Sequence, residues 1–92
     1  MSHILVIKML SGEELLAQFV SADAEFLTIN RPRVMQLQQT ERGVQASLAS
    51  WVISAPDQKD IQMSQRSIAA YFEAPADVSK LYLQATSGLI LG

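Results

Sequence analysis

The segment that most constrains the fold is residues 3–10, HILVIKML. In an extended chain its apolar side chains fall on both sides of the backbone: Leu5, Ile7 and Met9 on one side, and Ile4, Val6 and Leu10 on the other. A strand with this pattern has to be covered on both faces. The sequence therefore predicts that this strand lies at the centre of the fold.

Further extended segments follow at short spacing, separated by turn residues. The predicted strands are residues 14–22, 26–38, 44–53 and the two halves of 61–72, with turns at 11–13, 39–43 and 64–67. A helix over 13–20 is the rival interpretation of EELLAQF, but the flanking strands and the SG turn favour a hairpin. Short strands with tight turns predict a mainly β fold, a small and strongly bent five-stranded antiparallel barrel over about residues 3–73.

A helix is expected after the last strand, over about residues 75–87. Pro75 suits the first turn of a helix, and Val78, Leu81, Tyr82 and Ala85 fall on one helical stripe. The apolar tail LILG, residues 89–92, is not explained by a monomer. We expect one domain over residues 1–92, with no internal repeat or linker.

Composition narrows the partners of the chain. With 49% apolar and 17% charged residues, the chain has more apolar groups than so small a protein hides easily, which favours self-association. The net charge of −2 gives no general attraction for nucleic acid, although a local basic patch remains open. The absence of cysteine, of an 18-residue apolar run and of a signal-like start predicts a cytoplasmic protein without membrane contact.

Catalysis and metal binding receive little support. His3 is the only histidine, the acidic residues show no ligand spacing, and the four glycines form no phosphate-binding loop. We therefore expect no enzyme activity, no metal and no cofactor.

Residues 29–36, INRPRVMQ, place Arg31 and Arg33 on either side of Pro32 within an apolar strand. Because they are two residues apart, the two arginines are expected to project from the same side. There they either guard an edge and pair with the acidic segment 57–60 of a neighbouring subunit, or they contact a nucleic-acid backbone. Both interpretations stay open.

Two stretches resemble the motifs of Sm-like (LSm) proteins. Residues 6–29, VIKMLSGEELLAQFVSADAEFLTI, resemble the first motif, and residues 61–72, IQMSQRSIAAYF, resemble the second. The chain is most similar to the small Sm-like proteins encoded by cyanophages and marine phages. Asp23 matches the aspartate of the first motif, but the stacking position falls on Glu25, with Phe26 one residue away, and the asparagine position falls on Leu27.

The resemblance implies an SH3-like barrel that assembles edge to edge into a penta- to heptameric ring and binds single-stranded RNA, in the host cytoplasm if a phage encodes it. The RNA-binding candidates lie in two loops and one strand: Asp23, Glu25, Phe26, Arg31, Arg33, Gln65, Arg66 and Ser67. The alternative function is a non-catalytic scaffold ring that has lost the RNA pocket.

Overall fold

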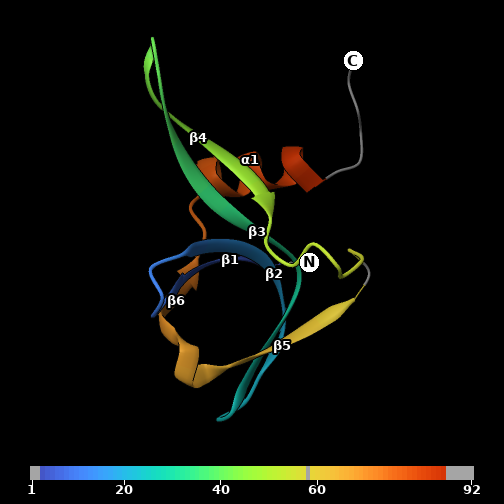
Figure 1. Ribbon diagram of the computed structural model, residues 1–92. Coiled ribbons are helices and arrows are strands. Elements are labelled where there is room, and N and C mark those ends of the chain that lie inside the picture. The colour runs from blue at the N-terminus through green and yellow to red at the C-terminus, as the bar shows by residue number, and fades with distance from the viewer. Residues whose placement is uncertain (1–2, 58, 87–92) are drawn as a thin grey trace.

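The computed structural model describes residues 3–57 and 59–86. The part of the chain so described forms six strands, a 3₁₀ turn and one helix (Figure 1). In order these are β1 (Ile4–Met9), β2 (Glu14–Ala22), β3 (Phe26–Thr40), β4 (Gly43–Ser50), β5 (Asp60–Ser64), the turn η1 (Gln65–Ser67), β6 (Ile68–Glu73) and α1 (Ala76–Thr86). The predicted mainly β fold with a C-terminal helix is confirmed, and 14–22 is a strand rather than a helix.

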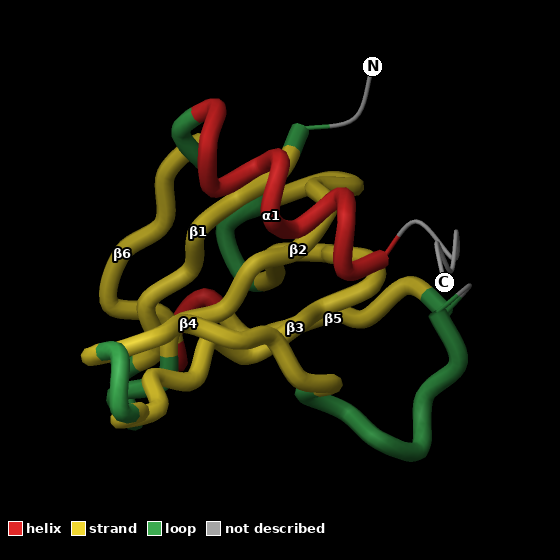
Figure 2. The backbone as a smooth tube through the Cα atoms, turned by 90° about the horizontal axis from the view of Figure 1, so that it is seen from above, coloured by secondary structure: helices red, strands yellow, loops and turns green. Residues whose placement is uncertain are grey.

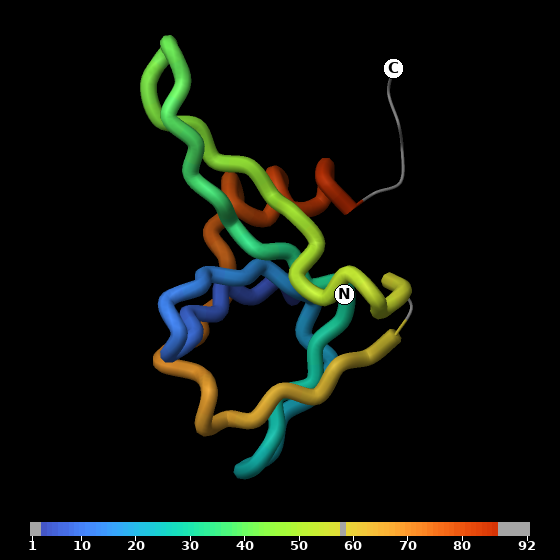
Figure 3. Tube along the Cα trace, in the orientation of Figure 1, coloured from blue at the N-terminus to red at the C-terminus, as the bar shows by residue number. Residues whose placement is uncertain are grey.

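The strands form one antiparallel sheet in the order β4-β3-β2-β1-β6, with β5 also paired to β3. The expected number of five strands is wrong for the described residues, because β3 is long enough to have two partners on the same side. Its first part, Phe26–Asn30, pairs with β5, and its second part, Arg33–Thr40, pairs with β4. No pairing between β5 and β6 is found among the described residues, so the sheet is open, although Figure 3 shows the strands curling round a common centre.

The apolar core consists of two clusters, one on each face of β1. The first fills the inside of the curled sheet: Leu5, Ile7, Met9, Leu15, Ala17, Leu27, Ile29 and Met63. The second lies under α1, which crosses above β1 and β2 (Figure 2), and contains Ile4, Val6, Leu16 and Tyr82. The prediction that the first strand is covered on both faces is therefore confirmed.

The segment around Pro32 is the point at which β3 bends and changes partner. Leu16 of β2 pairs with Arg33 and Gln18 pairs with Asn30, so Arg31 and Pro32 together oppose a single β2 residue. This is a β-bulge. Arg31 has a φ of 52°, in the left-handed region, which costs a non-glycine residue about 1–2 kcal/mol.

Contacts with α1 support this bend. The Tyr82 hydroxyl donates a hydrogen bond to the Arg31 carbonyl at 2.6 Å, and Arg31 Nη1 donates to the Thr86 carbonyl at 3.4 Å. A cation at the C-terminal end of a helix also interacts favourably with the helix dipole. The helix thus holds the strained corner of β3 in place.

Two predictions from the sequence need correction: the end of the fourth strand and the buried face of the helix. The strand expected over 44–53 ends at Ser50, and Trp51 turns aside to donate from Nε1 to Glu13 Oε2 at 3.0 Å. The expected helix stripe is rotated: Tyr82 is buried and Val78 is half-buried, whereas Leu81 and Ala85 are exposed. The buried positions continue at Thr86 instead, because the helix lies on the sheet along an i, i+4 row.

The LILG tail lies outside the described residues. None of the helices that the structure describes has the length and apolar character needed to cross a membrane.

Candidate nucleic-acid interface

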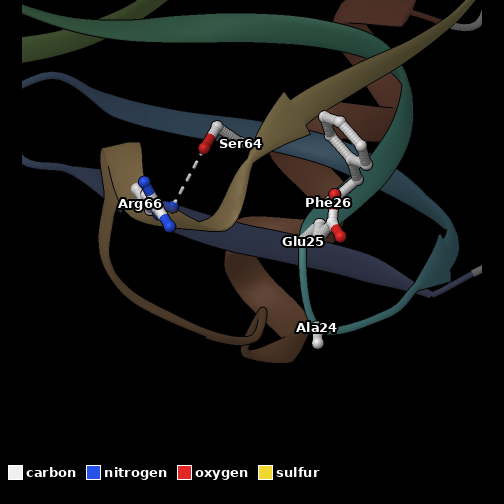
Figure 4. Close-up of a pocket in the computed structure, with 5 residues that line it drawn as sticks. All are labelled: Ala24, Glu25, Phe26, Ser64 and Arg66. Atoms are coloured by element: carbon white, nitrogen blue, oxygen red, sulfur yellow. Dashed lines mark hydrogen bonds between the residues drawn. The ribbon is translucent and has the colours of Figure 1, made fainter.

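Two loops that the sequence singled out meet at the end of the molecule opposite the tip of the β3–β4 hairpin (Figure 3). One is the β2–β3 loop and the other is η1, and a shallow pocket lies between them (Figure 4). It encloses about 430 Å³ and is lined by Ala24, Glu25, Phe26, Ser64 and Arg66. The structure therefore brings Glu25, Phe26 and Arg66, three of the predicted site residues, to one place.

Asp23 shapes the first loop. Its Oδ1 accepts hydrogen bonds from the backbone N–H groups of Phe26 and Glu25, both at 2.8 Å, and its own N–H donates to the Phe26 carbonyl at 2.9 Å. An aspartate that bonds the backbone two and three residues ahead builds a tight turn. The bond from Phe26 first, and that from Glu25 second, hold the pKa of the Asp23 carboxyl below its ordinary value. Oδ1 of this carboxylate therefore stabilises the loop through hydrogen bonds to its backbone.

Gln65 fastens the second loop to the first. Its Nε2 donates to the Asp23 carbonyl at 3.1 Å and to the Phe26 carbonyl at 3.5 Å, and its backbone N–H donates to the Glu25 carbonyl at 2.9 Å. The side-chain amide of Gln65 therefore holds the two loops together, and its predicted contact with RNA stays a prediction.

The turn η1 is closed by hydroxyl groups. Ser64 Oγ accepts from the Arg66 backbone N–H at 3.2 Å, and Ser67 Oγ donates to the Ser64 carbonyl at 2.7 Å. A serine before a helical turn is a good N-cap because its oxygen satisfies a free N–H group. Ser64 also lines the pocket, and sequence reasoning missed it because it focused on the next three residues of the turn.

The side chains left to face a ligand are an aromatic ring, a cation and a carboxylate. Phe26 is 37% exposed, although it is a large apolar residue. No hydrogen bond or ion pair within the described part of the chain engages the side chain of Arg66 or of Glu25. The aromatic side chain of a phenylalanine can stack on a nucleobase, and the guanidinium of an arginine can bind a phosphate or a base edge.

Arg31 and Arg33 do not line this pocket. Arg33 forms a two-pronged ion pair with Asp57 of the same chain, with Nη2 3.0 Å from Oδ2, and this pair lowers the pKa of the Asp57 carboxyl. Arg31 reaches instead towards the end of α1. Arg33 thus pairs with Asp57 of its own chain, where a neighbouring subunit's segment 57–60 was expected. That the two arginines project from one side or contact nucleic acid stays a prediction.

Metal binding finds no support in the described residues, which contain no group of three or more histidine, cysteine, aspartate or glutamate side chains placed to hold an ion.

Comparison with known proteins does not assign the chain to a family. No model of a known protein family matches the chain, and no curated protein is significantly similar to it.

Proposed function

We propose that this chain is a β-sheet module that binds single-stranded nucleic acid. More specifically, we propose an Sm-like protein that binds RNA as a homo-oligomeric ring, without enzymatic activity, in the cytoplasm of a cell or of a phage-infected host. The observation that carries the proposal is the pocket between the β2–β3 loop and η1. There the guanidinium of Arg66, which has no partner among the described residues, lies across from the partly exposed ring of Phe26 (Figure 4).

The strand order supports the Sm-like type. The strands β5, β3, β2, β1 and β6 follow one another around the apolar cluster, and a 3₁₀ turn joins β5 to β6. This arrangement is what a small, strongly bent SH3-like barrel requires, and both sequence stretches that resemble the Sm-like motifs lie on it. The helix α1 follows the last strand and covers the face of β1 and β2 that carries Ile4, Val6 and Leu16.

Ring formation is supported by free strand edges. The strands β4 and β6 stand at the two ends of the sheet order, so within residues 3–57 and 59–86 each has one side without a strand partner. Both carry exposed apolar side chains: Val44 on β4 is 62% exposed, and Phe72 on β6 is 54% exposed. Pairing between such edges of successive copies buries these groups and closes a ring, which we propose to be penta- to heptameric.

A ring also compensates for the weakness of one pocket. One aromatic stack and one arginine contact are expected to give only low affinity for RNA. The chain as a whole is acidic, so it adds no general electrostatic attraction for the RNA backbone. Several copies around one axis present the same pocket repeatedly to one strand, so the bound fraction rises through avidity.

The test is a fluorescence-anisotropy titration of a labelled single-stranded RNA at low and moderate salt. We expect the wild type to bind at tens of micromolar or better, and Arg66→Gln and Phe26→Ala to weaken binding at least about fivefold. Arg42→Gln is the matched control, because Arg42 is exposed in the turn at the far end of the β3–β4 hairpin. No binding by the wild type, or an equal loss in the Arg42 variant, would contradict the proposal.

The second candidate is a scaffold ring without RNA binding. The exposed apolar groups favour it, notably Leu37 at 71% and Ile53 at 91% exposed, as does the acidic charge balance. Light scattering that shows a ring, combined with an RNA titration that shows no binding, would select this alternative.

A further inference from the structure

We infer that the pocket selects a guanine base. This inference rests on the proposed RNA-binding function and adds the identity of the preferred base. The inference is based on the side chains of Glu25 and Arg66, which line the pocket and form no hydrogen bond within the described part of the two loops.

The polar group that the β2–β3 loop offers is the carboxylate of Glu25. An ionised carboxylate only accepts hydrogen bonds, and its two oxygens fit a pair of adjacent donors. Guanine presents such a pair, N1–H and the N2 amino group, on one edge. On the matching edges of adenine, cytosine and uracil, a donor stands beside one or two acceptors, which the carboxylate repels.

A uracil base needs a group that both donates and accepts, such as a side-chain amide. The amide of Gln65, which lies beside the pocket, already donates to the Asp23 and Phe26 carbonyls. Leu27 occupies the position at which the Sm-like motif has an asparagine, and it is fully buried in the core. No side-chain amide among the residues that line the pocket is thus available to uracil.

Arg66 adds a second fit to guanine. It belongs to η1, across the pocket from Glu25 and Phe26 (Figure 4). Guanidinium donors match the O6 and N7 acceptors of guanine, which lie on a different edge from N1 and N2. A guanine stacked on Phe26 can therefore be bound by Glu25 and Arg66 at the same time.

The backbone of Glu25 is fixed before any ligand arrives. Its N–H donates to Asp23 Oδ1 at 2.8 Å, and its carbonyl accepts from the Gln65 N–H at 2.9 Å. A group carried on a backbone that is bonded on both sides loses less conformational freedom on binding. Glu25 can therefore discriminate between bases although its side chain is exposed.

The test uses labelled RNA hexamers of adenine and cytosine that carry one variable base: guanine, inosine, adenine or uracil. We expect the guanine hexamer to bind about tenfold more tightly than the uracil hexamer, the scale of one good bidentate contact. Inosine lacks the N2 amino group and should fall between them. Glu25→Gln should reduce the guanine preference to about twofold or less, whereas the matched Glu41→Gln, at the exposed hairpin turn, should leave it unchanged.

The outcomes separate the two proposals. If no hexamer binds to the wild type, the RNA-binding function itself fails. If all hexamers bind equally, if uracil binds most tightly, or if the guanine preference survives in Glu25→Gln, the guanine inference is overturned while RNA binding stands.

Discussion

Truncation of Tyr82 tests whether α1 holds the bend of β3. The side chain is fully buried and packs in one cluster with Ile4, Val6 and Leu16. We expect Tyr82→Ala to lower the free energy of unfolding by about 3–5 kcal/mol, as for other large aromatic residues in cores. A chain of 92 residues has a total stability of roughly 5–14 kcal/mol, so this variant is expected to be close to unfolding.

Tyr82→Phe separates the hydroxyl from the ring. The hydroxyl donates to the Arg31 carbonyl at 2.6 Å, and its loss leaves this acceptor without that partner at a strained position. We expect a cost of about 1–2 kcal/mol. Because burial raises the pKa of Tyr82 to about 12, the phenol is neutral at pH 7, and its stabilising contribution should be lost only as the pH rises from about 10 through 12.

Urea unfolding followed by the fluorescence of Trp51, the only tryptophan, measures both variants. With a slope of roughly 1 kcal/mol per molar urea, Tyr82→Phe should lower the midpoint by about 1–2 M. Protein concentration has to be kept constant, because oligomerisation adds to apparent stability. The control is Leu83→Ala on the same helix, 48% exposed, which should cost about 0.5 kcal/mol or less. Equal losses in Leu83→Ala and Tyr82→Ala, or no loss in Tyr82→Phe, would refute this reasoning.

Three further predictions concern one ion pair, one glycine conformation and one loop hydrogen bond. A double-mutant cycle of Arg33→Gln and Asp57→Asn should give a coupling of about 0.5–1.5 kcal/mol in urea unfolding. Because folding lowers the Asp57 pKa, the coupling should be fully present above the ordinary pKa of an aspartate and should weaken as the pH falls through the lowered value; a coupling that does not weaken on acidification would contradict the pair. Gly12 has a φ of 103°, so Gly12→Ala should cost about 1–2 kcal/mol and lower Tm by several degrees, and an unchanged Tm would contradict the strain. Asp23→Ala should weaken RNA binding severalfold by loosening the loop, whereas Asp23→Asn, which keeps the acceptor oxygen, should retain most of the affinity in the same titration; equal losses would contradict the positioning role.

Much of the fold could be predicted because local patterns agree with it. The two-sided apolar pattern of residues 3–10 placed that strand between two clusters, and the second strand was predicted with the observed bounds of Glu14–Ala22. The third strand bends at Pro32. That the bend is also the point where β3 exchanges β5 for β4 depends on the pairing of β3 with β5, whose partners are 30 to 38 positions apart, and local patterns do not encode such pairing.

The candidate site was predicted in outline only. The motif resemblance brought together the two loops that form the pocket, and Glu25, Phe26 and Arg66 line it. The roles of individual polar groups could not be read from the sequence, because they depend on which partner is within hydrogen-bonding distance. Gln65 bonds the neighbouring loop, 39 and 42 positions away in the chain.

The most direct test of the account is to map where RNA contacts the protein. Ultraviolet cross-linking of a labelled single-stranded RNA to the wild-type chain, followed by mass spectrometry, identifies the contacted residues. We expect cross-links in residues 24–26 and 64–66, and their loss in Phe26→Ala. Cross-links confined to the β3–β4 hairpin or to α1, or no cross-link at saturating RNA, would contradict it.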